Sequence, residues 1–94
     1  MTLEDSIFKN AQNENIRIEK GLYSVYDVIK TVARKKAPRT TWSRLIDRFG
    51  YLANEVHYVR FPRIDGKAAN MSSPACNIPT ALDILGRLGL DDKK

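Results

Sequence analysis

The chain is poor in the residues from which active sites and metal centres are most often built. It has one cysteine, Cys76, and one histidine, His57, among 94 residues. A single cysteine excludes an intrachain disulfide and a multi-cysteine zinc site, and a single histidine excludes a histidine cluster. The five glycines form no phosphate-cradling GxxxxGK[ST] loop. We therefore predict a domain that is not an enzyme and that binds no metal and no cofactor.

Long apolar runs are also missing. No run approaches the roughly 18 residues that a membrane span needs. The first 15 residues, MTLEDSIFKNAQNEN, carry acids and amides where a signal peptide has a basic stretch followed by an apolar one. We expect a soluble cytoplasmic protein with no membrane partner, associated with the nucleoid if it binds DNA.

The apolar fraction of 43% is enough for one compact core. We expect a polar N-terminal arm over 1–13, a single domain over 14–90 and a charged tail over 91–94. The arm is interpreted as loose, or as one helical turn. Residues 15–19 alternate and predict a short strand with Ile16 and Ile18 on one face, closed by a turn at Lys20-Gly21.

Two helices are predicted next. Ser24 can cap the first, whose apolar residues recur at helical spacing as far as Ala33, so that Arg34, Lys35 and Lys36 fall in its last turn. Pro38 suits the first turn of the second helix, which Gly50 ends. The apolar stripe of this second helix is Trp42, Leu45, Ile46 and Phe49.

The second half of the chain predicts a hairpin and a final helix. Asp65-Gly66 is a strong two-residue turn signal, with arms near 57–63 and 68–73. Asn77 and Pro79 mark the start of a helix that ends near Gly89. The predicted fold class is α+β: a small antiparallel sheet, made of a short strand plus a hairpin, packed with three to four short helices.

The positive charge is concentrated in one place. Seven of the 16 basic residues lie between Lys30 and Arg48 with one acid, Asp47, so this window carries +6 while the whole chain carries +5. A local patch of one sign is typical of proteins that contact nucleic-acid phosphates. Hydroxyl groups among the arginines are further phosphate donors.

These residues form the predicted nucleic-acid site. Its members are Arg34, Lys35, Lys36, Arg39, Thr40, Ser43, Arg44 and Arg48, extended on the hairpin by Arg60, Arg63 and Lys67. A charged helix face is also, in many proteins, only solvated surface. Trp42 and Tyr26 can in principle stack on bases, although the position of Trp42 on an apolar stripe favours core packing.

The order of motifs resembles one family. Leu22-Tyr23-Ser24-Val25-Tyr26-Asp27-Val28-Ile29, then Pro38-Arg39-x-x-Trp42-Ser43-x-Leu45, then Asp65-Gly66-Lys67 and a terminal apolar helix are similar to the Bro-N domain of phage antirepressors and baculovirus repeated-ORF proteins. The resemblance covers residues 15–89. The segment 71–80 departs from it, because it lacks the Thr-Asp and Thr-Glu pairs often seen before the last helix.

The resemblance implies a role in DNA binding or transcriptional control. We predict an antirepressor-like domain that contacts duplex DNA, with Arg39, Arg44 and Arg48 as its main phosphate contacts. The alternative is an adaptor that uses the hairpin and the terminal helix to engage a repressor-like protein, or a homo-oligomer. Salt distinguishes the two, because phosphate binding releases counterions and an apolar interface does not.

Overall fold

The structure is a computed structural model that describes residues 2–61 and 72–90. Its elements are α1 (Leu3–Gln12), β1 (Ile18–Glu19), β2 (Leu22–Ser24), α2 (Val25–Thr31), α3 (Pro38–Arg48), α4 (Leu52–Glu55), β3 (His57–Val59), β4 (Ser73–Cys76) and α5 (Ile78–Arg87). The strands form one antiparallel sheet in the order β1-β2-β4-β3. The predicted α+β class is confirmed, with five helices in the described part of the chain where three to four were expected.

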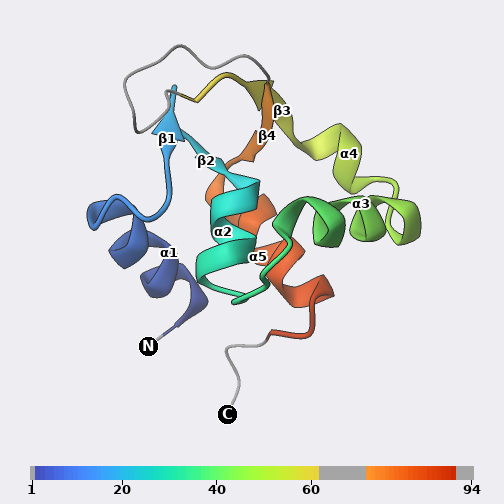
Figure 1. The fold of residues 1–94 in the computed structure, drawn as a ribbon, viewed down its shortest axis with the longest axis horizontal. Helices are drawn as coiled ribbons and strands as arrows, with labels where there is room; N and C mark the ends of the chain where they lie inside the picture. Colours follow the sequence, from blue (N-terminus) through green and yellow to red (C-terminus); the bar gives the residue numbers. More distant parts are fainter. Residues whose placement is uncertain (1, 62–71, 91–94) are drawn as a thin grey trace.

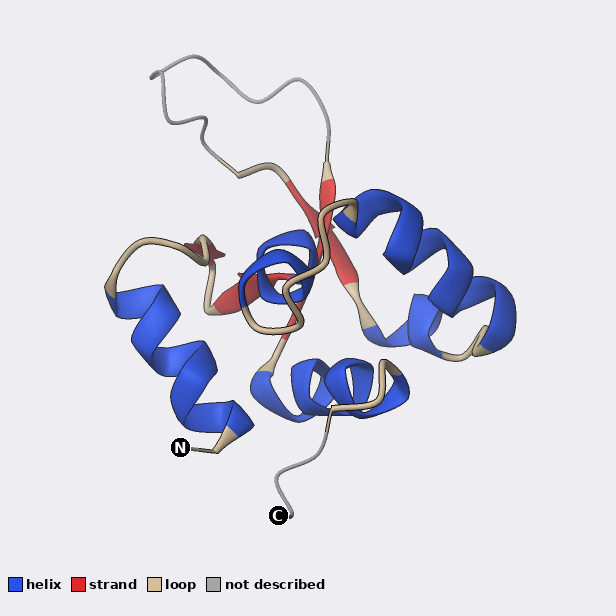
Figure 2. Cartoon of the chain, turned by 60° about the horizontal axis from the view of Figure 1, so that its bottom comes forward, coloured by secondary structure: helices blue, strands red, loops and turns tan. Residues whose placement is uncertain are grey.

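The helices lie together on one side of the molecule, with α2 at their centre. Figures 1 and 2 both show α1 and α3 on opposite sides of α2. In Figure 1 the sheet lies at the top, above α1 and α5. α2 packs against the central strand β4, against α3 and against α5. This arrangement leaves the outward face of α3 and the last turn of α5 at the surface.

The N-terminal segment differs from the sequence-based expectation. Residues interpreted as a loose arm or a single turn form the ten-residue helix α1. The Thr2 hydroxyl accepts a hydrogen bond from the Asp5 N–H at 3.0 Å, which caps the helix. Ile7 is fully buried in the core, so this segment is fixed by apolar packing, which its polar composition does not reveal.

The turn between β1 and β2 is confirmed. Lys20 and Gly21 have φ of 55° and 75°, and Glu19 pairs with Leu22 across them. The expected shared face of Ile16 and Ile18 is wrong: Ile16 is 2% exposed and Ile18 is 46% exposed. The Ile16 N–H donates back to the Asn10 carbonyl at 3.2 Å, so the extended strand begins only after this residue.

The cap of α2 is confirmed, but its predicted end is wrong. The Ser24 hydroxyl accepts from the Asp27 N–H at 3.3 Å. The helix ends at Thr31, because Arg34 has a left-handed backbone with φ of 57°. Arg34, Lys35 and Lys36 therefore belong to a linker, residues 32–37, rather than to the last turn of the helix. α3 begins at Pro38 as predicted.

The hairpin is confirmed in its antiparallel pairing, and residues 68–71 of its predicted second arm lie outside the described residues. β3 pairs antiparallel with β4, with His57 opposite Ala75 and Val59 opposite Ser73. Among the described residues, the second strand covers Ser73–Cys76 and so extends beyond the predicted end at 73. β4 lies between β2 and β3 in the sheet, and its small residues Ala75 and Cys76 are fully buried. The predicted turn at 65–66 lies outside the described residues.

The terminal helix is confirmed at both ends. The Asn77 side chain accepts from the Thr80 N–H at 3.1 Å, with Pro79 in the first turn. Gly89, with φ of 92°, ends α5, and the Leu90 N–H donates to the Leu85 carbonyl at 3.0 Å. This ending places Arg87 and Leu88 in a fixed position beside α3.

Trp42 belongs to the core, which confirms the packing interpretation. Its side chain is 3% exposed and lies in one cluster with residues from both ends of the chain, from Ile7 to Leu85. The indole Nε1 is buried without a hydrogen-bond partner among the described residues. A base cannot stack on this ring without opening the core.

Replacing Trp42 tests its packing role. Trp42→Ala should lower the free energy of unfolding by about 3–5 kcal/mol, as large core truncations do. Urea denaturation followed by circular dichroism measures the loss. Trp42→Phe should keep the fold, because the ring still fills much of the space. A stable Trp42→Ala variant would show that the side chain is not part of the core.

A pair of glycine variants tests the β1–β2 turn. Gly21→Ala should destabilise by about 1–2 kcal/mol, because a β-carbon is strained at positive φ. Gly86→Ala is the matched control in α5, where an added β-carbon has no neighbour within 4 Å. It should stabilise by about 0.5–1 kcal/mol, since alanine favours helix. Equal effects of the two changes in urea denaturation would contradict the turn assignment.

Candidate nucleic-acid interface

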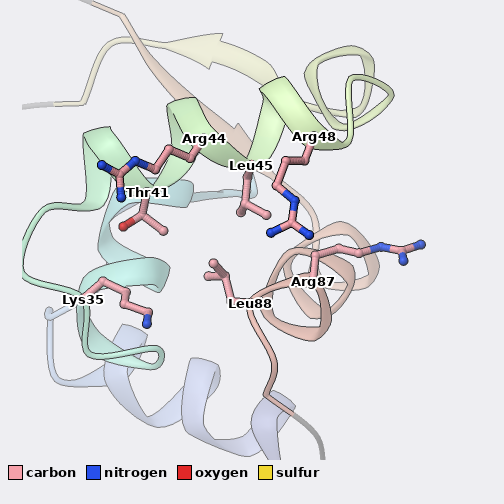
Figure 3. Close-up of a pocket in the computed structure, with 7 residues that line it drawn as sticks. All are labelled: Lys35, Thr41, Arg44, Leu45, Arg48, Arg87 and Leu88. Atoms are coloured by element: carbon pink, nitrogen blue, oxygen red, sulfur yellow. The ribbon is translucent and has the colours of Figure 1, made fainter.

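A surface pocket with a basic rim lies between α3, α5 and the linker 32–37. Its volume is about 380 Å³. We call it the basic pocket, and Figure 3 shows the seven residues that line it. They are Lys35, Thr41, Arg44, Leu45, Arg48, Arg87 and Leu88.

Three separate segments supply these side chains. α3 contributes Thr41, Arg44, Leu45 and Arg48, whose spacing of three and four residues puts them on one face of the helix. Lys35 comes from the linker that the left-handed Arg34 directs away from α2. The end of α5 supplies the rest. The pocket exists only because these three segments meet.

The floor is apolar and the rim is positive. Leu45 and Leu88 point toward each other in Figure 3, and Leu45 is 4% exposed. Of the described residues that line the pocket, four are cations and none is a carboxylate. The side chains of Lys35, Arg44 and Arg48 make no hydrogen bond or ion pair with any described residue. Within residues 2–61 and 72–90, three positive charges therefore stand at this pocket without a counter-charge.

Among the contacts of the described residues, Arg87 is the cation of the pocket that is held by side-chain hydrogen bonds. Its Nε donates to the Tyr51 hydroxyl at 3.0 Å, and that hydroxyl donates to Asp83 at 2.8 Å. Asp83 also forms an ion pair with Arg87 at 3.5 Å. The Tyr51 hydrogen bond raises the pKa of the Arg87 guanidinium further above its ordinary value. The terminal nitrogens of Arg87 make no hydrogen bond to a described residue.

The structure brings together only part of the predicted site. Lys35, Arg44 and Arg48 line the basic pocket. Exposed residues of the predicted site that do not line it are Arg34, Lys36, Arg39, Thr40, Ser43 and Arg60. Arg63 and Lys67 lie outside the described residues.

Arg39 does not share the face of the other two predicted arginines of α3. Five residues separate Arg39 from Arg44, which is about 140° around a helix, whereas Arg44 and Arg48 are only about 40° apart. The Arg39 guanidinium lies 5.2 Å from the ring centre of Tyr26 on α2. Stacking of Tyr26 on a base would have to displace Arg39 from this ring.

Four residues that line the pocket were not in the predicted site: Thr41, Leu45, Arg87 and Leu88. Thr41 lies one turn before Leu45 and could have been placed from the helical period. Arg87 could not, because nothing in the sequence shows that the end of α5 approaches α3. A basic residue in the last turn of a helix is common for reasons of the helix dipole alone.

The described residues give little support for a metal site or a reactive thiol. Residues 2–61 and 72–90 hold no group of three or more His, Cys, Asp or Glu side chains that could bind a metal. His57 is exposed. None of the helices described is long and apolar enough to cross a membrane. Burial raises the pKa of the Cys76 thiol to about 12, which keeps it protonated at neutral pH.

No protein-family model, curated protein or solved structure matches this chain. The resemblance to the Bro-N domain therefore depends on the order of motifs in the sequence and stays a prediction.

The buried thiol gives a prediction on reactivity and pH. Cys76 should react with a thiol reagent at neutral pH only after unfolding in urea. Its pKa is raised in the folded state from 9.0 to about 12, so the folded protein binds more protons between these values. Stability should therefore fall as pH rises through this window, and less so in Cys76→Ala. Rapid labelling of the folded protein would contradict the burial.

Proposed function

We propose that this domain is a non-enzymatic, antirepressor-like regulator that binds the phosphate backbone of duplex DNA through α3 and the basic pocket. Such a protein would act in the cytoplasm, at the nucleoid. The proposal agrees with the role that the Bro-N resemblance implies. It is argued from the charges at the pocket.

The observation that carries the proposal is the set of unpaired cations. Lys35, Arg44 and Arg48 line one pocket from the linker and α3, and no carboxylate of the described residues lines it. Cations that stabilise a fold are normally paired with acids, as Arg17 is with Asp27 at 2.8 Å. Unpaired cations of one sign instead attract a polyanion and release its counterions.

The outward face of α3 offers additional donors beside the pocket. Thr40 and Ser43 are exposed there and their hydroxyls can donate to phosphate oxygens. The helix has 11 residues and spans about 16 Å, which suits an approach along a DNA groove or backbone. Lys36 in the adjoining linker adds long-range attraction. These contacts position a duplex and carry no sequence readout by themselves.

The protein-binding adaptor is supported by a different observation. Tyr58 is 58% exposed on β3 and Ile18 is 46% exposed on β1, and these are the two outermost strands of the sheet. An edge strand can pair with a protein partner through its backbone, while its exposed apolar side chains pack against that partner. Such binding would depend little on salt.

Salt dependence tests the proposal. We expect the wild-type domain to bind a fluorescent duplex, with an affinity that falls steeply as salt rises. The double variant Arg44→Ala/Arg48→Ala should bind more weakly to every sequence. It should flatten the slope of log affinity against log salt by up to about 1.8, since each phosphate contact contributes about 0.9. Fluorescence anisotropy at several salt concentrations gives both values.

A charge-matched control separates the site from net charge. Lys9→Ala/Lys30→Ala removes two exposed lysines outside the pocket, on α1 and α2. It should leave the salt slope almost unchanged. Both double variants should remain folded, because exposed charges contribute little to stability. Equal losses in the two variants, or no binding by the wild type at low salt, would refute the proposal and favour the adaptor.

A further inference from the structure

We infer that the basic pocket is a binding site for a small polyphosphate anion, with pyrophosphate as its simplest member. The inference deepens the proposed function, because it uses the same cations and implies that such an anion competes with DNA. The recognised chemistry is two linked phosphate groups. Free pyrophosphate and the phosphate chain of a nucleotide both carry it.

The first argument is the shape of the site. A single phosphodiester can be contacted on a flat or convex surface, whereas these cations surround a hollow of about 380 Å³. This volume falls in the lower part of the range of about 300–1,000 Å³ found for small-molecule sites. A hollow of this size has room for an anion larger than one phosphate group.

The second argument is the direction from which the donors come. Arg48 points from α3 toward α5 in Figure 3, and Thr41 points from the same helix into the space above Lys35. Arg87 comes from the end of α5, on the opposite wall, and is held there by Tyr51 and Asp83. Lys35 on the linker and Arg48 on α3 are donors from two different segments, and they can bind the two ends of a linked pair of phosphates. Figure 3 also shows the guanidinium groups of Arg44 and Arg87 turned away from the centre, at the rim.

The third argument is electrostatic. Leu45 and Leu88 form the floor, and apolar surroundings reduce the screening of charges by water. Four cations around one hollow repel each other, and Asp83 offsets only Arg87 in the described structure. A multiply charged anion relieves this repulsion, so its binding should also stabilise the fold.

A second pocket provides the contrast. It is of similar size, about 420 Å³, and is lined by Glu14, Asn15, Arg17, Asp27, Lys30 and Thr31. Its charges are of both signs, and Arg17 is already paired with Asp27 through two hydrogen bonds from its side chain. Hollow shape alone is therefore common to both pockets, whereas a described lining with four cations and no carboxylate is found in the basic pocket.

Calorimetric titration of the full chain with sodium pyrophosphate tests the inference. Lys35→Ala and Lys36→Ala form a matched pair: both remove one exposed lysine from the same linker, and only Lys35 lines the pocket. Lys35→Ala and Arg48→Gln should each weaken binding about tenfold, since charge-assisted hydrogen bonds are the strong ones. Lys36→Ala and Arg60→Gln should change it less than twofold.

Further titrations distinguish free pyrophosphate from a nucleotide as the ligand, and they distinguish anion binding at the pocket from the proposed DNA binding. Pyrophosphate and a nucleoside diphosphate should bind similarly, inorganic phosphate more weakly, and pyrophosphate should displace DNA more than an equal ionic strength of NaCl. Pyrophosphate binding that Lys35→Ala and Lys36→Ala weaken equally, or that inorganic phosphate matches, would overturn the inference. DNA binding without pyrophosphate binding would overturn it and leave the proposed function standing. Pyrophosphate binding that depends on the pocket, without DNA binding, would support the inference and overturn the proposed function.

Discussion

The burial of one face of α2 is the constraint on which the other elements depend. Val25, Val28 and Ile29 are at most 1% exposed, and α3, α5 and β4 all pack against this short helix. Ser24 ends β2 and caps α2 at the same residue, so the sheet and the helices are joined without a loop. Because α2 has only seven residues, its stability comes from this packing and not from helix propensity.

The end of α2 decides where the positive charge of the linker goes. A helix that continued to Lys36 would have placed its cations on the dipole-stabilised last turn, where they would serve the helix itself. The left-handed Arg34 ends α2 early and directs Lys35 toward α3. A non-glycine residue at positive φ costs roughly 1–2 kcal/mol. α3 packs against α2, and Trp42 and Leu45 lie in the same core cluster as Val28. This packing fixes both ends of the linker and offsets such a cost.

The site combines unpaired and paired cations, and this difference matters for its function. Arg44 and Arg48 form no hydrogen bond or ion pair with a described side chain, and the Arg48 guanidinium lies 5.6 Å from the ring centre of Phe49. Arg87 is oriented by Tyr51 and by Asp83, and its guanidinium also lies 4.9 Å from the ring centre of Phe49. A preorganised cation loses less conformational entropy on binding an anion than a mobile one does. A proposed phosphate site with one fixed and several mobile donors can accept phosphates in more than one geometry.

The sequence by itself determined the elements whose signals are local. The Lys20-Gly21 turn, the Ser24 and Asn77 caps, the Pro38 helix start and the amphipathic stripe of α3 each depend on neighbouring residues, and so does the cluster of basic residues. Tertiary structure decided the rest. The N-terminal segment is helical because Ile7 packs into the core. The segment Ser73–Cys76 is a strand because it pairs with β2 on one edge and β3 on the other. Arg87 reached the basic pocket because α5 packs beneath α2, a long-range contact that no local pattern records.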